Sequence, residues 1–217
     1  TIDGIKRIRY TSPHPQDFND EILKTMSLNK NICSYIHLPL QSGSNRILKS
    51  MNRTYTRENF LNLVDKIYSY MPNCSISTDI IVGFPGETDS DFKDTLDIVD
   101  QAKFNFSYMF KYSPRPGTKA VEFDNQISED VKQSRLEDLI SFQNKITLDV
   151  NTKKIGKIEN ILIEKESKKS KDYWAGRTEG NIWTIVKKGN ESIKDIVPVH
   201  ITNAQGVTLF GNNLNII

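Results

Sequence analysis

Apolar positions along the first two thirds of the chain follow two alternating periods. Four short runs rich in β-branched and aromatic residues are typical of strands, and apolar residues at helical spacing follow each run. Strands that alternate with helices of ten or more residues predict an α/β fold with a parallel sheet and right-handed crossovers. The four predicted strands cover residues 5–11, 35–40, 76–82 and 106–111.

The third of these units shows the pattern most clearly. A β-branched run at 76–82 contains one carboxylate, Asp79, and a Gly-Phe-Pro-Gly sequence at 83–86 ends it. Thr88, with Asp91 three residues later, resembles a capping box, so a helix should begin just after the glycines. The loops that follow strands form the ligand crevice of α/β proteins, which makes this turn a candidate site.

The last third of the chain changes to a period of two. A long helix is predicted from Ser128, and five short strands with turns between them follow it. Such a series predicts a small closed all-β barrel of the OB type. We place the boundary so that residues 1–153 form the α/β domain and residues 154–217 the β-barrel. The five strands cover residues 158–163, 173–177, 182–186, 196–201 and 207–214.

Four strands are too few to close a parallel barrel, which usually has eight. Either the sheet is open, or the α/β domain is half of a barrel whose other half lies outside this sequence. In both cases the strand at 5–11 would be an exposed edge. Because an unpaired edge invites pairing with another chain, we expect self-association through it.

Composition excludes several classes of protein. The chain has 217 residues, 26% charged and 37% hydrophobic, which is ordinary for a globular protein. No apolar run approaches the length of a membrane span, and the N-terminus lacks the features of a signal peptide, so a cytoplasmic location is predicted. The two cysteines, Cys33 and Cys74, lack the spacing of a metal or disulfide motif and are predicted to be buried.

Charge is distributed unevenly along the chain. Residues 1–150 carry 18 Lys and Arg against 20 Asp and Glu, whereas residues 151–217 carry 11 against 7. A basic β-barrel with Tyr173, Trp174 and Trp183 as stacking candidates suggests a polyanionic partner, although clustered lysines can also simply solvate a surface. The predicted RNA-binding residues are Lys165, Lys168, Lys169, Lys171, Arg177, Lys187 and Lys188.

The loops after the four strands should share one face of the sheet. They cover residues 12–15, 41–44, 83–87 and 113–118, and their polar groups include His14, Gln41, Ser42, Glu87 and Arg115. One hypothesis is that these loops converge on an elongated polar ligand. The alternative is that they are only turns, with Glu87 as a solvated acid favoured by the helix dipole. No nucleophile-base set, carboxylate pair or Walker lysine appears, so the residues alone name no reaction.

Four motifs nevertheless resemble a known family. The segments HLPLQSGS at 37–44, MNRTYT at 51–56, STDIIVGFPGET at 77–88 and YSPRPGT at 112–118 are similar to the radical S-adenosylmethionine (SAM) methylthiotransferases. The tail with Gly-Arg-Thr-Glu at 176–179 resembles their RNA-binding TRAM domain. The Gln-Ser-Gly-Ser and Arg-Pro-Gly elements favour the tRNA-modifying branches over the ribosomal-protein branch.

The resemblance implies a partial, open barrel of the radical SAM type and a specific reaction. The branch that it favours adds a methylthio group to C2 of isopentenyl-adenosine beside the anticodon of tRNA. SAM and two 4Fe-4S clusters are its cofactors, and the tRNA anticodon stem-loop and an electron donor protein are its partners. Alternatives are the branch that modifies threonylcarbamoyl-adenosine, and an RNA-binding module with a non-catalytic α/β domain. A metabolic enzyme for a phosphorylated substrate is a third hypothesis, but the expected glycine-rich signatures are missing.

The resemblance also implies site residues and a missing part. Gln41 and Ser42 should meet the ribose or methionine part of SAM, and Asp79, Gly83 and Phe84 should flank its adenine. The last strand end contributes two further cofactor-binding residues, Tyr112 and Arg115. The family's Cys-x-x-x-Cys-x-x-Cys motif is absent. We therefore expect a C-terminal part of a longer enzyme, with no metal ligands, clusters, bound cofactor, catalytic residues or activity of its own.

Overall fold

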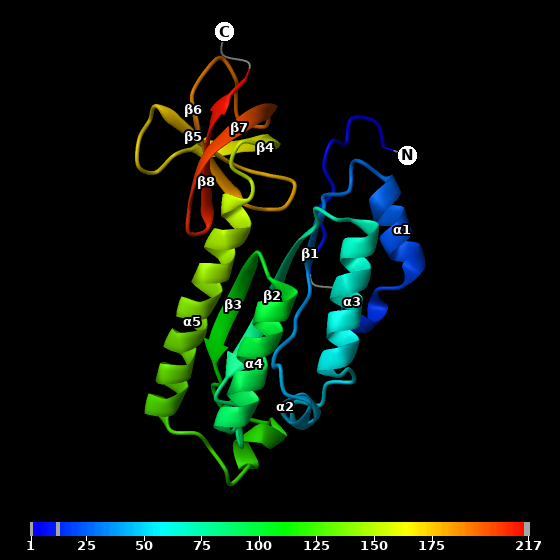
Figure 1. Ribbon diagram of the computed structural model, residues 1–217, viewed down its shortest axis with the longest axis vertical. Coiled ribbons are helices and arrows are strands. Elements are labelled where there is room, and N and C mark those ends of the chain that lie inside the picture. The colour runs from blue at the N-terminus through cyan, green and yellow to red at the C-terminus, as the bar shows by residue number, and fades with distance from the viewer. Residues whose placement is uncertain (1, 12–13, 215–217) are drawn as a thin grey trace.

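A computed structural model describes residues 2–11 and 14–214 of the chain. It consists of an α/β body and a small β-barrel that lie one after the other along the long axis (Figure 1). Each has its own cluster of buried apolar residues. In the part of the chain that is described, no helix combines the length and the apolar character needed to cross a membrane.

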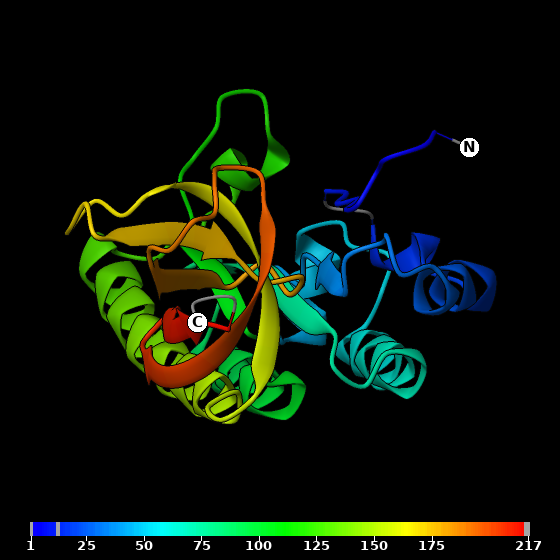
Figure 2. The same ribbon diagram turned by 90° about the horizontal axis from the view of Figure 1, so that it is seen from above.

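The α/β body is built on a parallel sheet in the order β1-β2-β3. Seen from above, the main helices lie in a row on one side of this sheet (Figure 2). The other face is open and carries three half-exposed aromatic residues of β3, Phe106, Tyr108 and Phe110. The strands are β1 (Tyr35–His37), β2 (Ser75–Val82) and β3 (Phe106–Lys111), and the helices are η1 (Pro15–Asp17), α1 (Asp20–Leu28), α2 (Asn45–Ser50), α3 (Arg57–Tyr70), α4 (Asp89–Ala102), η2 (Lys119–Glu122) and α5 (Glu129–Thr152).

Three of the four predicted strands are confirmed. β1 is shorter than predicted because Pro39 has no backbone N–H and interrupts the ladder. The chain stays extended beyond it, and Gln41 N–H donates to the Asp79 carbonyl at 2.8 Å. The predicted capping box at Thr88 also forms, so α4 begins just after the glycines, and Thr56 caps α3 in the same way.

The predicted strand at 5–11 is wrong. Within this segment only Ile8 forms a bridge, to Ile32, and Ser12 and Pro13 of the predicted loop lie outside the described residues. The alternating basic residues bind the β-barrel instead: Arg7 Nη1 donates to the Arg177 carbonyl at 2.9 Å, and Arg9 Nη2 to the Thr178 carbonyl at 3.2 Å. The expected self-association through an edge strand at 5–11 therefore lacks a structural basis.

The predicted β-barrel is confirmed as a closed barrel of five strands in the order β4-β5-β6-β8-β7. Close packing between β4 and β5 requires glycine at position 176, because a Cβ there would lie 2.2 Å from the Leu162 carbonyl oxygen. α5 ends at Thr152, close to the predicted boundary. The strands are β4 (Ile158–Glu166), β5 (Tyr173–Arg177), β6 (Trp183–Lys187), β7 (Ile196–Gln205) and β8 (Thr208–Asn213).

The β-barrel docks at the amino-terminal end of the parallel sheet. Gly180, in the loop between β5 and β6, packs so closely on Ser75, the first residue of β2, that an added Cβ would meet Ser75 Oγ at 2.2 Å. Asn151 at the end of α5 donates to the Gly206 carbonyl at 2.8 Å. The carboxyl ends of the parallel strands therefore point away from the β-barrel (Figure 1).

Candidate functional site

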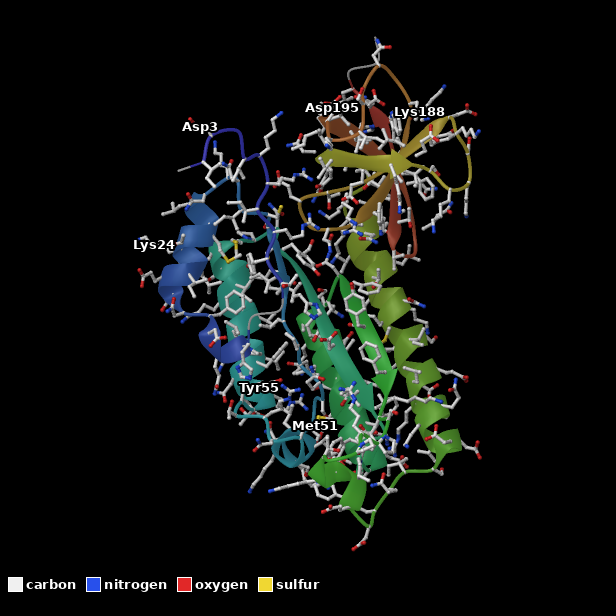
Figure 3. All side chains as sticks on the ribbon, turned by 180° about the vertical axis from the view of Figure 1, so that it is seen from behind. Asp3, Lys24, Met51, Tyr55, Lys188 and Asp195 are labelled. Carbon is white, nitrogen blue, oxygen red and sulfur yellow. The ribbon has the colours of Figure 1, made fainter. Side chains whose placement is uncertain are left out.

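A cavity of about 880 Å³ opens at the carboxyl ends of the three parallel strands. Its position is the one at which α/β proteins bind ligands, and Met51 marks this end of the molecule in Figure 3. The residues that line it come from the end of α2 and the loop after it, the three strand ends and the segment around η2. They are Gln41, Lys49, Ser50, Met51, Asn52, Arg53, Asp79, Ile81, Phe84, Phe110, Lys111, Tyr112, Ser113, Arg115, Thr118, Lys119, Ala120 and Phe123.

Most of the residues predicted to bind the cofactor meet at this cavity. Five of the seven line it, namely Gln41, Asp79, Phe84, Tyr112 and Arg115. Ser42 is completely buried, and its Oγ accepts a hydrogen bond from Ser44 N–H at 3.2 Å. Gly83 is covered by Lys132, whose Cγ would lie 2.3 Å from an added Cβ. The structure thus places Ser42 and Gly83 behind the lining, where they shape its loops.

Gln41 adopts a backbone conformation that non-glycine residues rarely use. Its φ angle is 72°, in the left-handed region. Backbone hydrogen bonds on both sides hold it there, from its own N–H to the Asp79 carbonyl and from Ile81 N–H to its carbonyl at 2.9 Å. Strain that surrounding structure maintains is typical of functional sites, and here it accompanies a side chain that lines the cavity.

Aromatic rings form one wall of the cavity. Phe84 contacts Tyr112 edge-on, with ring centroids 5.1 Å apart, and Phe123 at 6.2 Å. The Tyr112 hydroxyl is buried, and no hydrogen-bond partner for it exists among the described residues. A buried polar atom without a partner costs free energy, so the wall combines apolar surface with a hydroxyl that a ligand could satisfy.

A histidine on the open face of the sheet fixes the carboxylate of Asp79. His37 Nε2 lies 3.2 Å from Asp79 Oδ2, and its Nδ1 lies 2.8 Å from Ser77 Oγ. The ring of Tyr108 packs edge-on against the imidazole at 5.7 Å. His37 is therefore a buried histidine with both nitrogens hydrogen-bonded, and it holds Asp79 at the cavity wall.

The turn at 83–87 is held by a buried ion pair. Glu87 is 3% exposed, so its interpretation as a solvated acid is wrong. Its Oε2 accepts from Gly83 N–H at 2.7 Å and from Arg135 Nη1 at 2.9 Å. Burial raises the pKa of Glu87, against the opposing effects of Gly83 N–H and Arg135. Arg135 of α5 thus clamps the turn that carries Phe84.

A second network joins the loops that follow β1 and β2. Asp91 Oδ1 accepts from Ser44 Oγ at 2.6 Å, and Asp91 also binds Arg46 and Thr88. Burial opposes ionisation of Asp91, but the hydrogen bonds from Arg46, Ser44 and Thr88 together hold its pKa well below the ordinary value. The side chain stays ionised at neutral pH and ties the loop after β1 to the start of α4.

The predicted basic residues of the β-barrel fall into two groups. Lys165 and Arg177 lie over the ring of Trp183, at 4.5 and 4.2 Å from its centroid. Lys188 lies 4.1 Å from the centroid of Trp174 and pairs with Glu166 at 2.5 Å. The remaining four are exposed at one end of the barrel and have no ion pair among the described residues: Lys168, Lys169, Lys171 and Lys187.

The two predicted sites lie at opposite ends of the molecule. α5 begins beside the cavity, where Arg135 binds the turn, and ends at the β-barrel. With 24 residues it spans about 36 Å at 1.5 Å per residue. Figure 3 shows the same separation between Met51 at the cavity end and Lys188 in the β-barrel.

Several residues of the site were not predicted from the sequence. Arg53 lies within the motif at 51–56, and that motif could have pointed to it, because the segment forms the loop between α2 and α3. Arg135 carries no local signal, since it belongs to a helix with the periodicity of a core element. The other missed residues are Lys49, Met51, Lys119, Phe123 and Lys132.

Comparison with known protein families identifies two regions. Residues 2–99 match the family described as the Radical SAM superfamily, and residues 152–214 match the TRAM domain. Among solved structures, coproporphyrinogen III oxidase from Escherichia coli, described as a radical SAM enzyme, is similar with a TM-score of 0.53. That comparison covers 76% of this chain and 45% of that chain at 14% identity, and it shows the fold alone.

Curated relatives are similar along almost the whole chain. The tRNA-2-methylthio-N(6)-dimethylallyladenosine synthase of Pelotomaculum thermopropionicum is 45% identical over 97% of this chain. A protein of the same name from Fusobacterium nucleatum is 46% identical over 97%. The alignments cover 47% and 48% of these two proteins, so the chain spans about half the length of the curated relatives it matches. This span agrees with the partial chain expected from the sequence.

Proposed function

We infer, from the premise that this chain belongs to the radical SAM superfamily and carries a TRAM domain, that it is part of a tRNA methylthiotransferase. The proposed reaction adds a methylthio group to C2 of isopentenyl-adenosine beside the anticodon. The observation that carries this proposal is the similarity along nearly the whole chain to the dimethylallyladenosine synthases. We propose that this part binds the SAM nucleoside and the RNA.

We propose that the cavity at the strand ends binds SAM through its nucleoside part. SAM, when bound and reductively cleaved, supplies the radical that activates the substrate carbon. Asp79 is the acidic group of the lining and, held by His37, can accept hydrogen bonds from ribose hydroxyls. Phe84 and Ile81 provide apolar surface for an adenine ring. The unpartnered hydroxyl of Tyr112 adds a donor at the same wall.

Iron-sulfur clusters are not matched by the residues of this chain. Across the described residues, no group of three or more His, Cys, Asp or Glu could hold a metal ion. Both cysteines are buried, and burial raises the pKa of Cys74 to about 12, which disfavours the thiolate that ligates iron. We derive no step through a cluster and propose that other parts of the enzyme hold these groups.

The TRAM domain supports an RNA partner. Lys168, Lys169, Lys171 and Lys187 present unpaired positive charge at one end of the barrel. Cations that neutralise phosphates release counterions, which supplies most of the affinity of non-specific RNA binding. We propose the anticodon stem-loop of tRNA as the partner, a cytoplasmic location, and reduction by an electron donor protein.

A gene deletion tests which modified adenosine in tRNA is the substrate. In the source organism, deletion of the sequence that encodes the chain should remove methylthio-isopentenyl-adenosine from tRNA digests and leave isopentenyl-adenosine in its place. Mass spectrometry of the nucleosides measures both. If the methylthio group disappears from threonylcarbamoyl-adenosine instead, the second branch is the correct one. Unchanged nucleosides would support the RNA-binding module without catalytic function.

A further inference from the structure

The mouth of the strand-end cavity is strongly basic. Lys49, Arg53, Lys111, Arg115 and Lys119 line it, whereas Asp79 is the one acidic residue in the lining. This concentration is unusual for its domain, since residues 1–150 carry two more acidic than basic side chains. A net positive cavity in a net negative domain indicates a ligand with negative charge.

Four of these five cations are free to bind an external ligand. Lys111 pairs with Glu129 at 3.4 Å. Lys49, Arg53, Arg115 and Lys119 have no ion pair with any residue of the described ranges. Arg53 also has a buried Nε donor that no described acceptor satisfies. Since buried donors are normally hydrogen-bonded, this nitrogen indicates a group that belongs to the bound state.

SAM itself does not explain this charge. It carries a sulfonium, an ammonium and one carboxylate, so its net charge is positive at neutral pH. One cation is enough to pair with its carboxylate, and further cations would repel it. A partner with several negative charges close together fits the rim better, and RNA phosphates have this property.

The distance to the TRAM domain makes a second RNA contact necessary. Under the proposed function, the target base must enter the cavity, because SAM would react there. The unpaired lysines of the barrel lie beyond the other end of α5, which is about 36 Å long. They cannot hold the nucleotides that surround the target base, so those nucleotides need their own contacts at the cavity.

We propose that Lys49, Arg53, Arg115 and Lys119 form a second RNA-binding surface, the cavity rim, which binds phosphates of the anticodon loop. The TRAM lysines bind the stem at the same time. This inference rests on the proposed function and adds a location to it. Each rim contact that neutralises a loop phosphate should release about 0.7 of a counterion, the value for single strands.

Salt-dependent binding of a fluorescein-labelled anticodon stem-loop, measured by anisotropy, tests the rim. The rim variant replaces three exposed residues and leaves the half-buried Arg53 in place, K49A/R115A/K119A. We expect its log-log salt slope to be flatter by about two, and its affinity to be roughly 50-fold lower at 0.15 M salt, from three contacts at 0.7 each. A duplex of the same stem without the loop should bind wild type and rim variant alike.

The matched control removes three exposed lysines that lie away from both sites and have no ion pair among the described residues, K24A/K30A/K145A. Its slope should equal that of wild type. A TRAM variant, K168A/K169A/K171A, should lose affinity for both the stem-loop and the duplex.

Two results would count against these proposals in different ways. If the rim variant binds the stem-loop like the control while the TRAM variant binds it weakly, the rim is not an RNA surface, but the RNA partner of the proposed function stands. If wild type shows no salt-dependent binding to either RNA, the proposed RNA partner fails, and the rim proposal fails with it. Circular dichroism spectra that match wild type establish that each variant is folded.

Discussion

Arg135→Met tests how the turn beside the cavity is held in place. Arg135 donates to the Glu87 carbonyl at 3.1 Å, to Glu87 Oε2 at 2.9 Å and to Asp89 Oδ1 at 2.7 Å. Its side chain is 8% exposed and that of Glu87 is fully buried. Removing one partner of a buried ion pair leaves the other charge without compensation, which costs about 3–5 kcal/mol. The contact with exposed Asp89 adds little to this loss, since exposed pairs contribute at most about 1 kcal/mol.

The loss should depend on pH in a defined direction. Burial raises the pKa of Glu87, and removal of Arg135 takes away one of the effects that oppose this rise. With a raised pKa, the folded state holds a proton at pH values where the unfolded state has already lost it, so stability increases as pH falls through this window. The destabilisation by R135M should therefore be largest above the raised pKa and shrink as Glu87 becomes protonated.

Two spectroscopic probes separate the domains in this experiment. Both tryptophans lie in the β-barrel, so their emission reports unfolding of that domain, whereas ellipticity at 222 nm follows mainly the helices of the α/β body. Urea titrations should move the transition at 222 nm and leave the tryptophan transition nearly unchanged. A matched double variant, R135M/E87Q, removes the buried charge as well and should recover part of the stability.

An R135M variant whose stability lies within about 1 kcal/mol of wild type at neutral pH would show that Arg135 does not hold the turn through a buried ion pair. A double variant no more stable than R135M would show that the cost does not come from an unpaired Glu87.

Three further predictions concern the contact between the two domains, the β-barrel and the buried thiol of Cys74. Arg9→Met should weaken the contact between the two domains, because Arg9 donates to the backbone of the loop between β5 and β6. Limited proteolysis should then cleave the chain between the domains faster than in wild type. Gly176→Ala should destabilise the β-barrel by about 1–3 kcal/mol in urea titrations, since the added Cβ would overlap the Leu162 carbonyl, whereas Gly117→Ala meets no atom within 4 Å and should cost only the strain of its positive φ. Cys74, whose pKa burial raises to about 12, should react with a thiol reagent at pH 8 only at the rate of unfolding.

The elements that the sequence predicts well are those whose signals are local. The capping boxes at Thr56 and Thr88 fix the starts of α3 and α4 by hydrogen bonds within four residues, and alternation identifies the strands of the β-barrel. The parallel strand ends also bring Gln41, Asp79 and Tyr112 together as expected, because strands of one sheet share their carboxyl edge.

The failures have a common physical cause in contacts between distant segments. Alternation at 5–11 predicted a strand, but its basic side chains find carbonyl acceptors about 170 residues away in the β-barrel. Glu87 has the position of a solvated first-turn acid, but in the fold its buried carboxylate pairs with the guanidinium of Arg135, 48 residues later. Local sequence patterns do not predict such pairs, because the residues around one partner contain no information about the position of the other.

α5 connects the two ends of the molecule mechanically. Its first turns hold the cavity through Arg135, and its last turn holds the β-barrel through Asn151. Arg7 and Arg9 attach the amino-terminal segment of the α/β body to the same barrel, so the cavity rim and the TRAM lysines stay at a fixed separation. Binding at one end then raises the effective concentration of RNA at the other only if the RNA is long enough to reach both. If both surfaces bind phosphates as proposed, this fixed spacing should select RNA by length.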